Sequence, residues 1–175
     1  MRVHLVAVDE GATELVGAAR RLRTAPGQSR FSVLPEVSFP LALADPARTP
    51  FAVLEDHVDG GAEVVGAGVL DTAAPASDPE LADLLTAAGH DPARAVLLRS
   101  FVIGAGHQGR GLGTAAARAT RELAQQVAGA DAVVLTVNER NPAGRRAYER
   151  AGFGDVGRYL GGDAGPQRAM VARCG

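Results

Sequence analysis

The sequence predicts an α/β fold built on a mixed β-sheet. Apolar runs of strand length alternate with segments whose apolar residues recur at helical spacing, in the order β-α-loop-β-β-α-β-α-β-α-β-β. The composition favours a folded core, because 46% of the 175 residues are hydrophobic and 22% are charged. A chain of this length is expected to form one domain, covering residues 1–175.

The first half of the chain predicts one strand, one helix and a hairpin. Residues 2–8 are apolar enough for a strand, and residues 13–24 place Leu15, Ala19 and Leu22 on one helical face. The prolines of the next stretch predict a loop with no more than a short helical turn: Pro35, Pro40, Pro46 and Pro50. Two apolar runs around the turn VDGG then predict a hairpin over residues 51–70.

The second half predicts three helices and four strands. Asp78 can cap a helix that starts at Pro79 and ends before Gly89. A second helix is expected to follow a glycine-rich loop, and a third to run from Pro142 to Gly152. The strands are expected at residues 95–103, 132–137, 155–160 and 167–172. The role of residues 71–94 is not evident from the sequence.

Charge and cysteine content limit the classes of partner. The net charge of −2 gives no electrostatic reason to expect nucleic acid or a membrane surface, and no apolar run approaches the ~20 residues of a membrane span. Cys174 is the single cysteine, so no internal disulfide forms and a reducing cytoplasm is expected. We expect a soluble cytoplasmic protein without a metal ion. A homodimer is compatible with the sequence.

The loop after residues 95–103 contains two overlapping glycine patterns. One is the dinucleotide-binding pattern G-x-G-x-x-G, formed by Gly104, Gly106 and Gly109. The other is Q-x-x-G-x-G, a pattern of acyl-coenzyme A binding, formed by Gln108, Gly111 and Gly113. Both would place a pyrophosphate at the N-terminus of the following helix.

The dinucleotide pattern fits the surrounding sequence poorly. It requires an acidic residue ~20 positions further on, whereas the next strand ends near Glu139, thirty residues after Gly109. Its helix would also hold Gly111 and Gly113 in the first turns, at up to ~1 kcal/mol each relative to alanine. A helix that begins near Gly111 instead leaves the glycines in the loop or first turn, where the amides of residues 109–114 can face one anion.

A second motif lies one helix and one strand downstream. The pattern N-P-x-G-x-x-x-Y-x-x-x-G-F is formed by Asn141, Gly144, Tyr148, Gly152 and Phe153. Together with the strand that ends at Ile103, the segment HQGRGLG and the strand VVLTV, it resembles the GNAT superfamily of N-acetyltransferases over residues 97–153. The resemblance implies acetyl-coenzyme A as co-substrate. It also implies a mixed, mostly antiparallel sheet of about six or seven strands, flanked by helices, whose central strands splay apart.

The resemblance implies a role for each residue of the two motifs. The backbone of Ile103 would bind the pantetheine arm, and Asn141 would lie near that arm, although Asn before Pro also fits a helix cap. The pyrophosphate would be wrapped by Gln108, Gly109, Arg110, Gly111, Gly113 and Thr114. Arg145 or Arg146 would reach the 3′-phosphate or remain solvated. Tyr148 would act as general acid toward the leaving thiolate, or else be a core aromatic residue.

The group that takes the proton from the amine is not fixed by the sequence. Residues 95–103 hold only Arg99 and Ser100 as polar residues, whereas many members of the family carry Glu or His on this strand. The open alternatives are a water relay or one of four side chains: Glu36, Glu55, His57 and His107. The acceptor also stays open among antibiotic, polyamine, amino acid and protein N-terminus. A non-catalytic module that senses acyl-coenzyme A is the alternative function.

Overall fold

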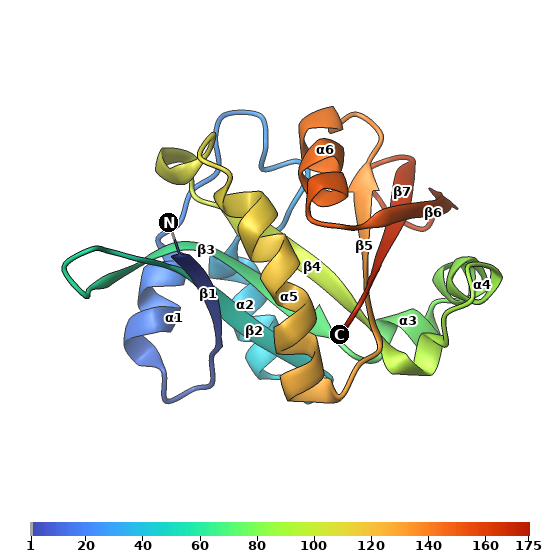
Figure 1. The fold of residues 1–175 in the computed structure, drawn as a ribbon, viewed down its shortest axis with the longest axis horizontal. Helices are drawn as coiled ribbons and strands as arrows, with labels where there is room; N and C mark the ends of the chain where they lie inside the picture. The colour runs from blue at the N-terminus through green and yellow to red at the C-terminus, as the bar shows by residue number, and fades with distance from the viewer. Residues whose placement is uncertain (1) are drawn as a thin grey trace.

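The computed structural model describes residues 2–175, whose strands form one sheet in the order β1-β2-β3-β4-β5-β7-β6. Every neighbouring pair is antiparallel except β4 and β5, which are parallel. The predicted mixed, mostly antiparallel sheet is therefore confirmed (Figure 1). The strands are β1 (Arg2–Ala7), β2 (Arg48–Asp56), β3 (Ala62–Asp71), β4 (Ala95–Ile103), β5 (Ala132–Asn138), β6 (Gly154–Tyr159) and β7 (Gln167–Arg173).

Helices cover both faces of the sheet. The α-helices are α1 (Thr13–Arg20), α2 (Pro35–Leu43), α3 (Ala74–Ser77), α4 (Pro79–Ala87), α5 (Leu112–Ala128) and α6 (Pro142–Arg150), and the short 3₁₀ turns are η1 (Pro92–Arg94) and η2 (Ala105–His107). Helix α5 lies in front of the sheet in Figure 1, and α1 and α2 lie behind it. The largest apolar cluster joins α5 to β4 and β5 through Leu112, Ala116, Val96, Leu98, Val133 and Leu135.

Two smaller clusters fill the opposite face. One packs α1 and α2 against β2 and β3, with Phe39 and Val69 fully buried. The other packs Leu81 and Leu85 of α4 against β5 and β7, so the segment 71–94 serves as the cover of this end of the sheet. None of the helices within residues 2–175 has the length and apolar character that a membrane-crossing helix needs.

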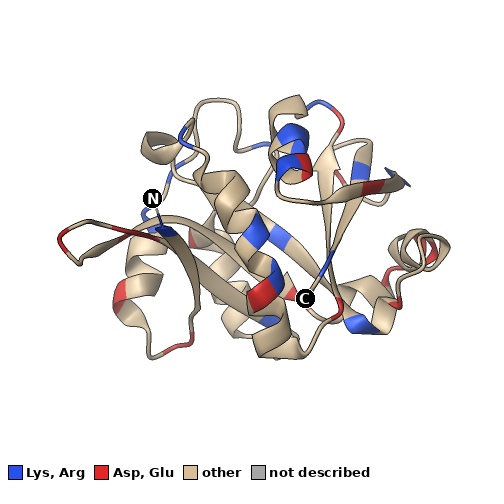
Figure 2. Ribbon diagram, in the orientation of Figure 1, with Lys and Arg blue, Asp and Glu red and all other residues tan. Residues whose placement is uncertain are grey.

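The local signals for helix ends are confirmed. The Asp78 carboxylate accepts the Leu81 N–H at 3.1 Å as the cap of α4, and Gly89 beyond its end has φ +80°. Helix α5 starts at Leu112, directly after Gly111 in the left-handed conformation. Charged residues cluster unevenly on this frame, with arginines on α6 and around β6 and β7 (Figure 2).

The prediction of a loop with one short turn at Pro35–Pro50 was wrong. Pro35 occupies the first position of α2, a nine-residue helix that also contains Pro40. Pro40 lacks one backbone donor, but Phe39 and Ala42 are buried against the sheet beside it. The burial of these side chains offsets the lost hydrogen bond, so packing overrides the helix-breaking tendency of proline.

Candidate active site

The two central strands separate halfway along their length. The parallel pairing of β4 and β5 joins Ala95–Leu98 to Ala132–Leu135 and then stops. Both strands continue beyond this point, to Ile103 and Asn138, without pairing to each other. The predicted splay is thus present, and a cavity of about 790 Å³ runs through it from one face of the sheet to the other.

A β-bulge at Ser100 sets the direction of the residues around the gap. Arg99 pairs with Val69 and Val102 with Ala67, so β4 holds one more residue than β3 in this interval. Ser100 adopts φ +51°, the positive value that accommodates the extra residue. As a result Leu98 and Phe101 both pack on the α5 face, although residues three apart in a regular strand would face opposite sides.

The backbone of β4 beyond the bulge faces the gap. The Gly104 N–H donates to the Val65 carbonyl at 2.9 Å, which directs this residue toward β3. By alternation, the polar groups of Phe101 and Ile103 point to the opposite edge, where β5 is absent. The Ile103 carbonyl there accepts a hydrogen bond from Gln108 Nε2 at 3.0 Å. An extended amide chain could pair with this edge as a further strand does.

The glycine loop places open backbone at the N-terminus of α5. Gly109 and Gly111 have φ +77° and +80°, and no heavy atom lies within 4 Å of the position where their Cβ would be. Their small size leaves space over the first amides of a 17-residue helix, whose dipole favours an anion. The cavity is lined here by Gln108, Gly109, Gly111, Gly113 and Thr114.

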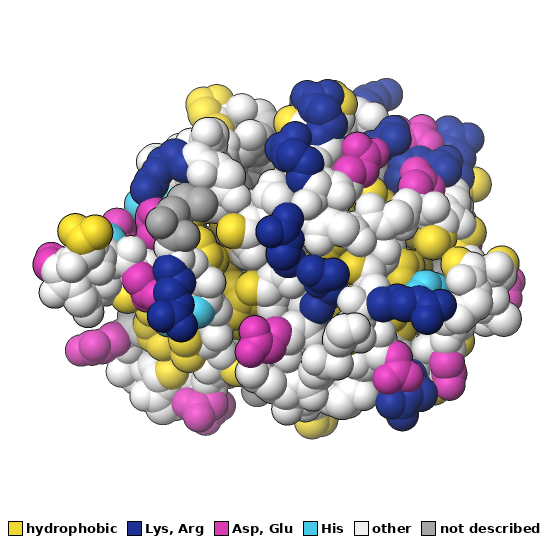
Figure 3. All heavy atoms as spheres, viewed as in Figure 1, with side chains coloured by type: hydrophobic (Ala, Val, Ile, Leu, Met, Phe, Trp, Pro, Cys, Tyr) yellow, Lys and Arg dark blue, Asp and Glu magenta, His cyan; other side chains and the backbone are white. Residues whose placement is uncertain are grey.

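The basic residues are distributed differently from the expectation. Arg110 does not line the cavity but forms a 2.6 Å ion pair with Glu55, whose side chain is buried. Arg145 lies 3.7 Å from Glu149 on α6, and neither Arg145 nor Arg146 lines the cavity. Arg150, which the sequence patterns did not single out, does line it. Arginine side chains cover α6 and the adjoining part of α5 in Figure 3.

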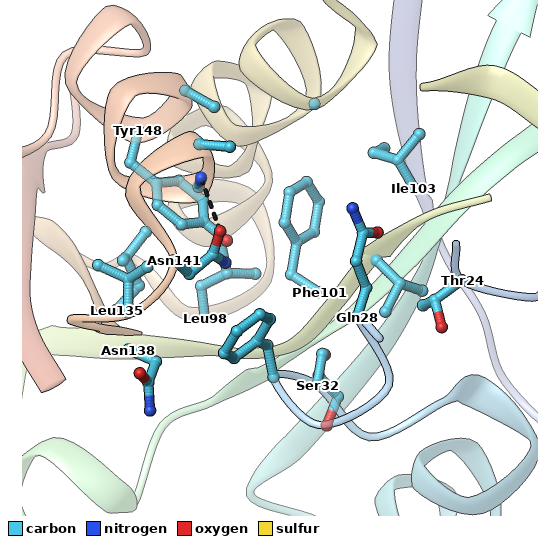
Figure 4. Close-up of a pocket in the computed structure, with 18 of the residues that line it drawn as sticks. Thr24, Gln28, Ser32, Leu98, Phe101, Ile103, Leu135, Asn138, Asn141 and Tyr148 are labelled. Atoms are coloured by element: carbon cyan, nitrogen blue, oxygen red, sulfur yellow. Dashed lines mark hydrogen bonds between the residues drawn. The ribbon is translucent and has the colours of Figure 1, made fainter. Parts of the chain in front are cut away.

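Tyr148 and Asn141 both lie in the cavity wall. Tyr148 reaches from α6 toward Phe101 on β4 (Figure 4), with ring centroids 6.3 Å apart, and contacts Phe153 edge-on at 6.0 Å. Burial in this aromatic group raises the pKa of Tyr148 to about 12. Asn141 accepts the Gly144 N–H at 3.0 Å, so it is the N-cap of α6 and also lines the cavity.

The sequence matches the model of the Acetyltransferase (GNAT) family over residues 16–153. The chain belongs to this family. No curated protein sequence matches the chain significantly.

Solved structures of GNAT enzymes share the fold. The aminoglycoside acetyltransferase AAC(6')-Ib, solved with coenzyme A and kanamycin, has a TM-score of 0.68 and 21% identity over 98% of this chain and 95% of that one. Spermidine N-acetyltransferase from Vibrio cholerae, solved with coenzyme A and spermine, has a TM-score of 0.61 and 14% identity over 98% and 95% of the two chains. At these identities the similarity concerns the fold.

The four candidate bases of this GNAT acetyltransferase are mostly engaged elsewhere. Glu55 pairs with Arg110, Glu36 lies 3.7 Å from Arg23, and His57 lies 3.7 Å from Glu63. Of the four, His107 alone lines the cavity, and its Nε2 lies 3.7 Å from Glu63. The structure adds one carboxylate that sequence patterns missed, Asp163 in the β6–β7 loop.

The part of the cavity on the face of the sheet opposite Tyr148 is lined by two loops that contain no recognised sequence motif. The α1–α2 loop contributes residues 28–33, and the β6–β7 loop contributes Asp163 and Ala164. Asn138 and Ser32 lie on the opposite side of the β4 and β5 strands from Tyr148 in Figure 4. The Gln108 side chain also donates to Gln28 Oε1 at 2.8 Å, which ties this loop to the glycine loop. Sequence reasoning missed these residues because no spacing rule connects the two loops.

Proposed function

We propose that residues 1–175 form one N-acetyltransferase domain, which transfers the acetyl group of acetyl-coenzyme A directly to an amine. The observation that carries this proposal is the gap between β4 and β5, with backbone amides along one edge and a glycine loop at its end. Kanamycin and spermine, present in the structures named above, are both amines, which supports an amine acceptor for this chain.

The residues present fit acetyl-coenzyme A, which supplies the acetyl group as a thioester when bound. Gly109, Gly111, Gly113 and Thr114 would hold the pyrophosphate with their amides and the α5 dipole. The backbone edge at Phe101 and Ile103, which has no β5 partner and where the Ile103 carbonyl accepts from Gln108 Nε2, would bind the pantetheine amides and lead the arm back along β4. This path ends where the strands rejoin, at Leu98 and Leu135, beside Tyr148.

Tyr148 would donate its hydroxyl proton toward the leaving sulfur, while the amine arrives through the opposite half of the cavity. His107 or Asp163 would take the proton of the amine, directly or through a water chain. These two side chains line the cavity and form no ion pair with an arginine of residues 2–175. A covalent route through Cys174 is not expected, since this residue does not line the cavity and burial raises the pKa of its thiol.

Two measurements on the purified chain test the proposal. Calorimetry should show acetyl-coenzyme A binding, and a thiol-trapping assay should show free coenzyme A released with at least one amine of a broad panel. Binding of acetyl-coenzyme A without release of free coenzyme A with any of the amines would instead support the acyl-coenzyme A sensing module. Binding of a reduced nicotinamide cofactor in place of coenzyme A would overturn both.

A further inference from the structure

Arg99 stands at the point where the gap opens. The pairing of β4 with β5 ends at Leu98, so Arg99 is the first residue of β4 without a β5 partner. Leu98 packs on the α5 face, which directs Arg99 to the opposite face of the sheet. That face carries the α1–α2 and β6–β7 loops, and Arg99 lines the cavity there. Its guanidinium therefore flanks the acceptor side of the reaction centre.

The guanidinium of Arg99 is held in place from behind. Its Nη1 donates to Asp71 Oδ2 at 3.0 Å, and Asp71 is only 3% exposed. The same carboxylate accepts from Arg48 Nε at 3.2 Å and from the backbone N–H groups of Ala73 and Ala74. Arg48 also lies 3.2 Å from Asp45, so Arg48 has a carboxylate of its own and, in the part of the chain that the structure describes, Arg99 is tied to the cluster by Asp71 alone.

Arg99 has donors to spare for a ligand. Its Nε and Nη2 make no hydrogen bond with any side chain or backbone group of residues 2–175, and its side chain is 41% exposed. A guanidinium fixed at one nitrogen presents the others as a rigid fork, a geometry that matches a carboxylate.

Most of the charged side chains that line the cavity are arginines. Arg30, which stacks on Phe31 at 4.7 Å, and Arg150 also line it, whereas Asp163 is the one carboxylate in the lining within residues 2–175. A molecule with several ammonium groups would meet like charges here. An amine that carries its own carboxylate would place that group on Arg99 and keep its nitrogen at the gap.

We propose that the acceptor is a small amine bearing a carboxylate, as in an amino acid, and that Arg99 binds this carboxylate. This inference rests on the proposed acetyl transfer. The side chain of the acceptor would then lie against the apolar part of the same wall, formed by Phe31 and Val33. The carboxylate is held while the neutral amine attacks, so Arg99 contributes to affinity for the acceptor rather than to the chemical step.

The test compares the twenty standard amino acids with their α-carboxamides, and with spermine and kanamycin, in the thiol-release assay. We expect at least one amino acid to exceed its amide, spermine and kanamycin in kcat/KM. Arg99→Gln should lower the acid-to-amide ratio of kcat/KM by about 10- to 100-fold, mainly through KM, because a charge-assisted bidentate contact is lost. An amino acid and its amide differ in the pKa of the amine, but this difference is the same for wild type and variant. Comparing the acid-to-amide ratio between the two proteins therefore removes it.

Arg48→Gln is the matched control. It also leaves Asp71 with one guanidinium partner, but Arg48 does not line the cavity, so the ratio should stay within about twofold. If Arg99→Gln does not fold, Arg99→Lys keeps a cation beside Asp71 and should still lower the ratio, since the fork is lost.

Three results would overturn the assignment while leaving acetyl transfer intact. These are a wild-type preference for amides or polyamines, an acid-to-amide ratio that survives in a folded Arg99 variant, and an equal fall of the ratio in Arg48→Gln. Absence of thiol release with every amine would instead refute the proposed function itself.

Discussion

Replacing Tyr148 with phenylalanine tests whether its hydroxyl takes part in catalysis or whether the residue serves only in packing. The ring stays between Phe101 and Phe153, at centroid distances of 6.3 and 6.0 Å. The Tyr148 hydroxyl makes no hydrogen bond with any group of residues 2–175, so its removal should change the free energy of unfolding by less than about 1 kcal/mol. A structural role alone therefore predicts normal turnover.

The raised pKa limits how the hydroxyl can act. With a pKa of about 12 for Tyr148 and ~8.5 for an ordinary thiol, complete proton transfer to the thiolate is uphill by ~5 kcal/mol, against ~2 kcal/mol for an unperturbed tyrosine. The hydroxyl should therefore stabilise the leaving sulfur mainly as a hydrogen-bond donor. We expect Tyr148→Phe to lower the maximal rate ~100-fold, at the low end of general acid catalysis.

The assay measures thiol release at saturating substrates, coenzyme A affinity by calorimetry and the melting temperature on one preparation. Affinity and melting temperature should be nearly unchanged while the rate falls. A second signature is the pH profile, since Tyr148 stays protonated until the pH nears 12 and should cause no loss of rate between pH 8 and 10. A Phe variant with full activity would refute the role of Tyr148 as donor.

Three further substitutions test the geometry around the site. Gly113→Ala should raise the free energy of unfolding by up to ~1 kcal/mol, because alanine favours the first turn of α5 and the new Cβ meets only Ile103 Cγ1 at 3.5 Å. The same substitution should weaken coenzyme A binding roughly tenfold, because the new methyl group crowds the amides that would hold the phosphate. Unchanged affinity in calorimetry would remove Gly113 from the site. Arg110→Gln should lower the free energy of unfolding by ~2 kcal/mol, because it leaves the buried Glu55 unpaired, and the double variant with Glu55→Gln should recover this stability. Coenzyme A affinity should stay within twofold of the wild type. A large loss of affinity at normal stability would instead assign Arg110 to the cofactor site. Gly68→Ala places a Cβ 2.5 Å from Phe51 Cζ and 3.2 Å from Phe101 Cδ2, so denaturant unfolding should show a loss of roughly 1–3 kcal/mol, and an unchanged midpoint would mean that the two rings move freely.

Local chemistry made most of the fold predictable from the sequence. Asp78 followed by proline marks the start of α4, Gly111 marks the start of α5, and Asn141 caps α6. These signals depend on one to three neighbouring residues, which the sequence displays directly. The loop, strand and helix order therefore follows without knowledge of tertiary contacts.

The proposed acceptor half of the cavity depends on contacts between distant segments and was not predictable in the same way. Asp163 reaches the cavity because β6 and β7 form a hairpin, and Arg99 is held by Asp71, 28 residues earlier. Helix α2 likewise exists because Phe39 and Ala42 find a surface on β2 and β3. Such pairings carry no periodic signal, so the sequence left both the acceptor and the base open.

One backbone feature joins the two halves of the site. Without the extra residue at Ser100, Arg99 and Phe101 would lie on the same face of β4, since they are two apart in a strand. The bulge instead directs Phe101 to Tyr148 and leaves Arg99 on the opposite face, beside Asp71, where we propose that the acceptor binds. The positive φ of Ser100 costs roughly 1 kcal/mol or more, and the pairing of β3 with β4 on both sides of the bulge maintains it. The bulge follows directly after the last pair of β4 with β5, at Leu98, so under the proposed function the cofactor and the acceptor would meet beside this one irregular residue.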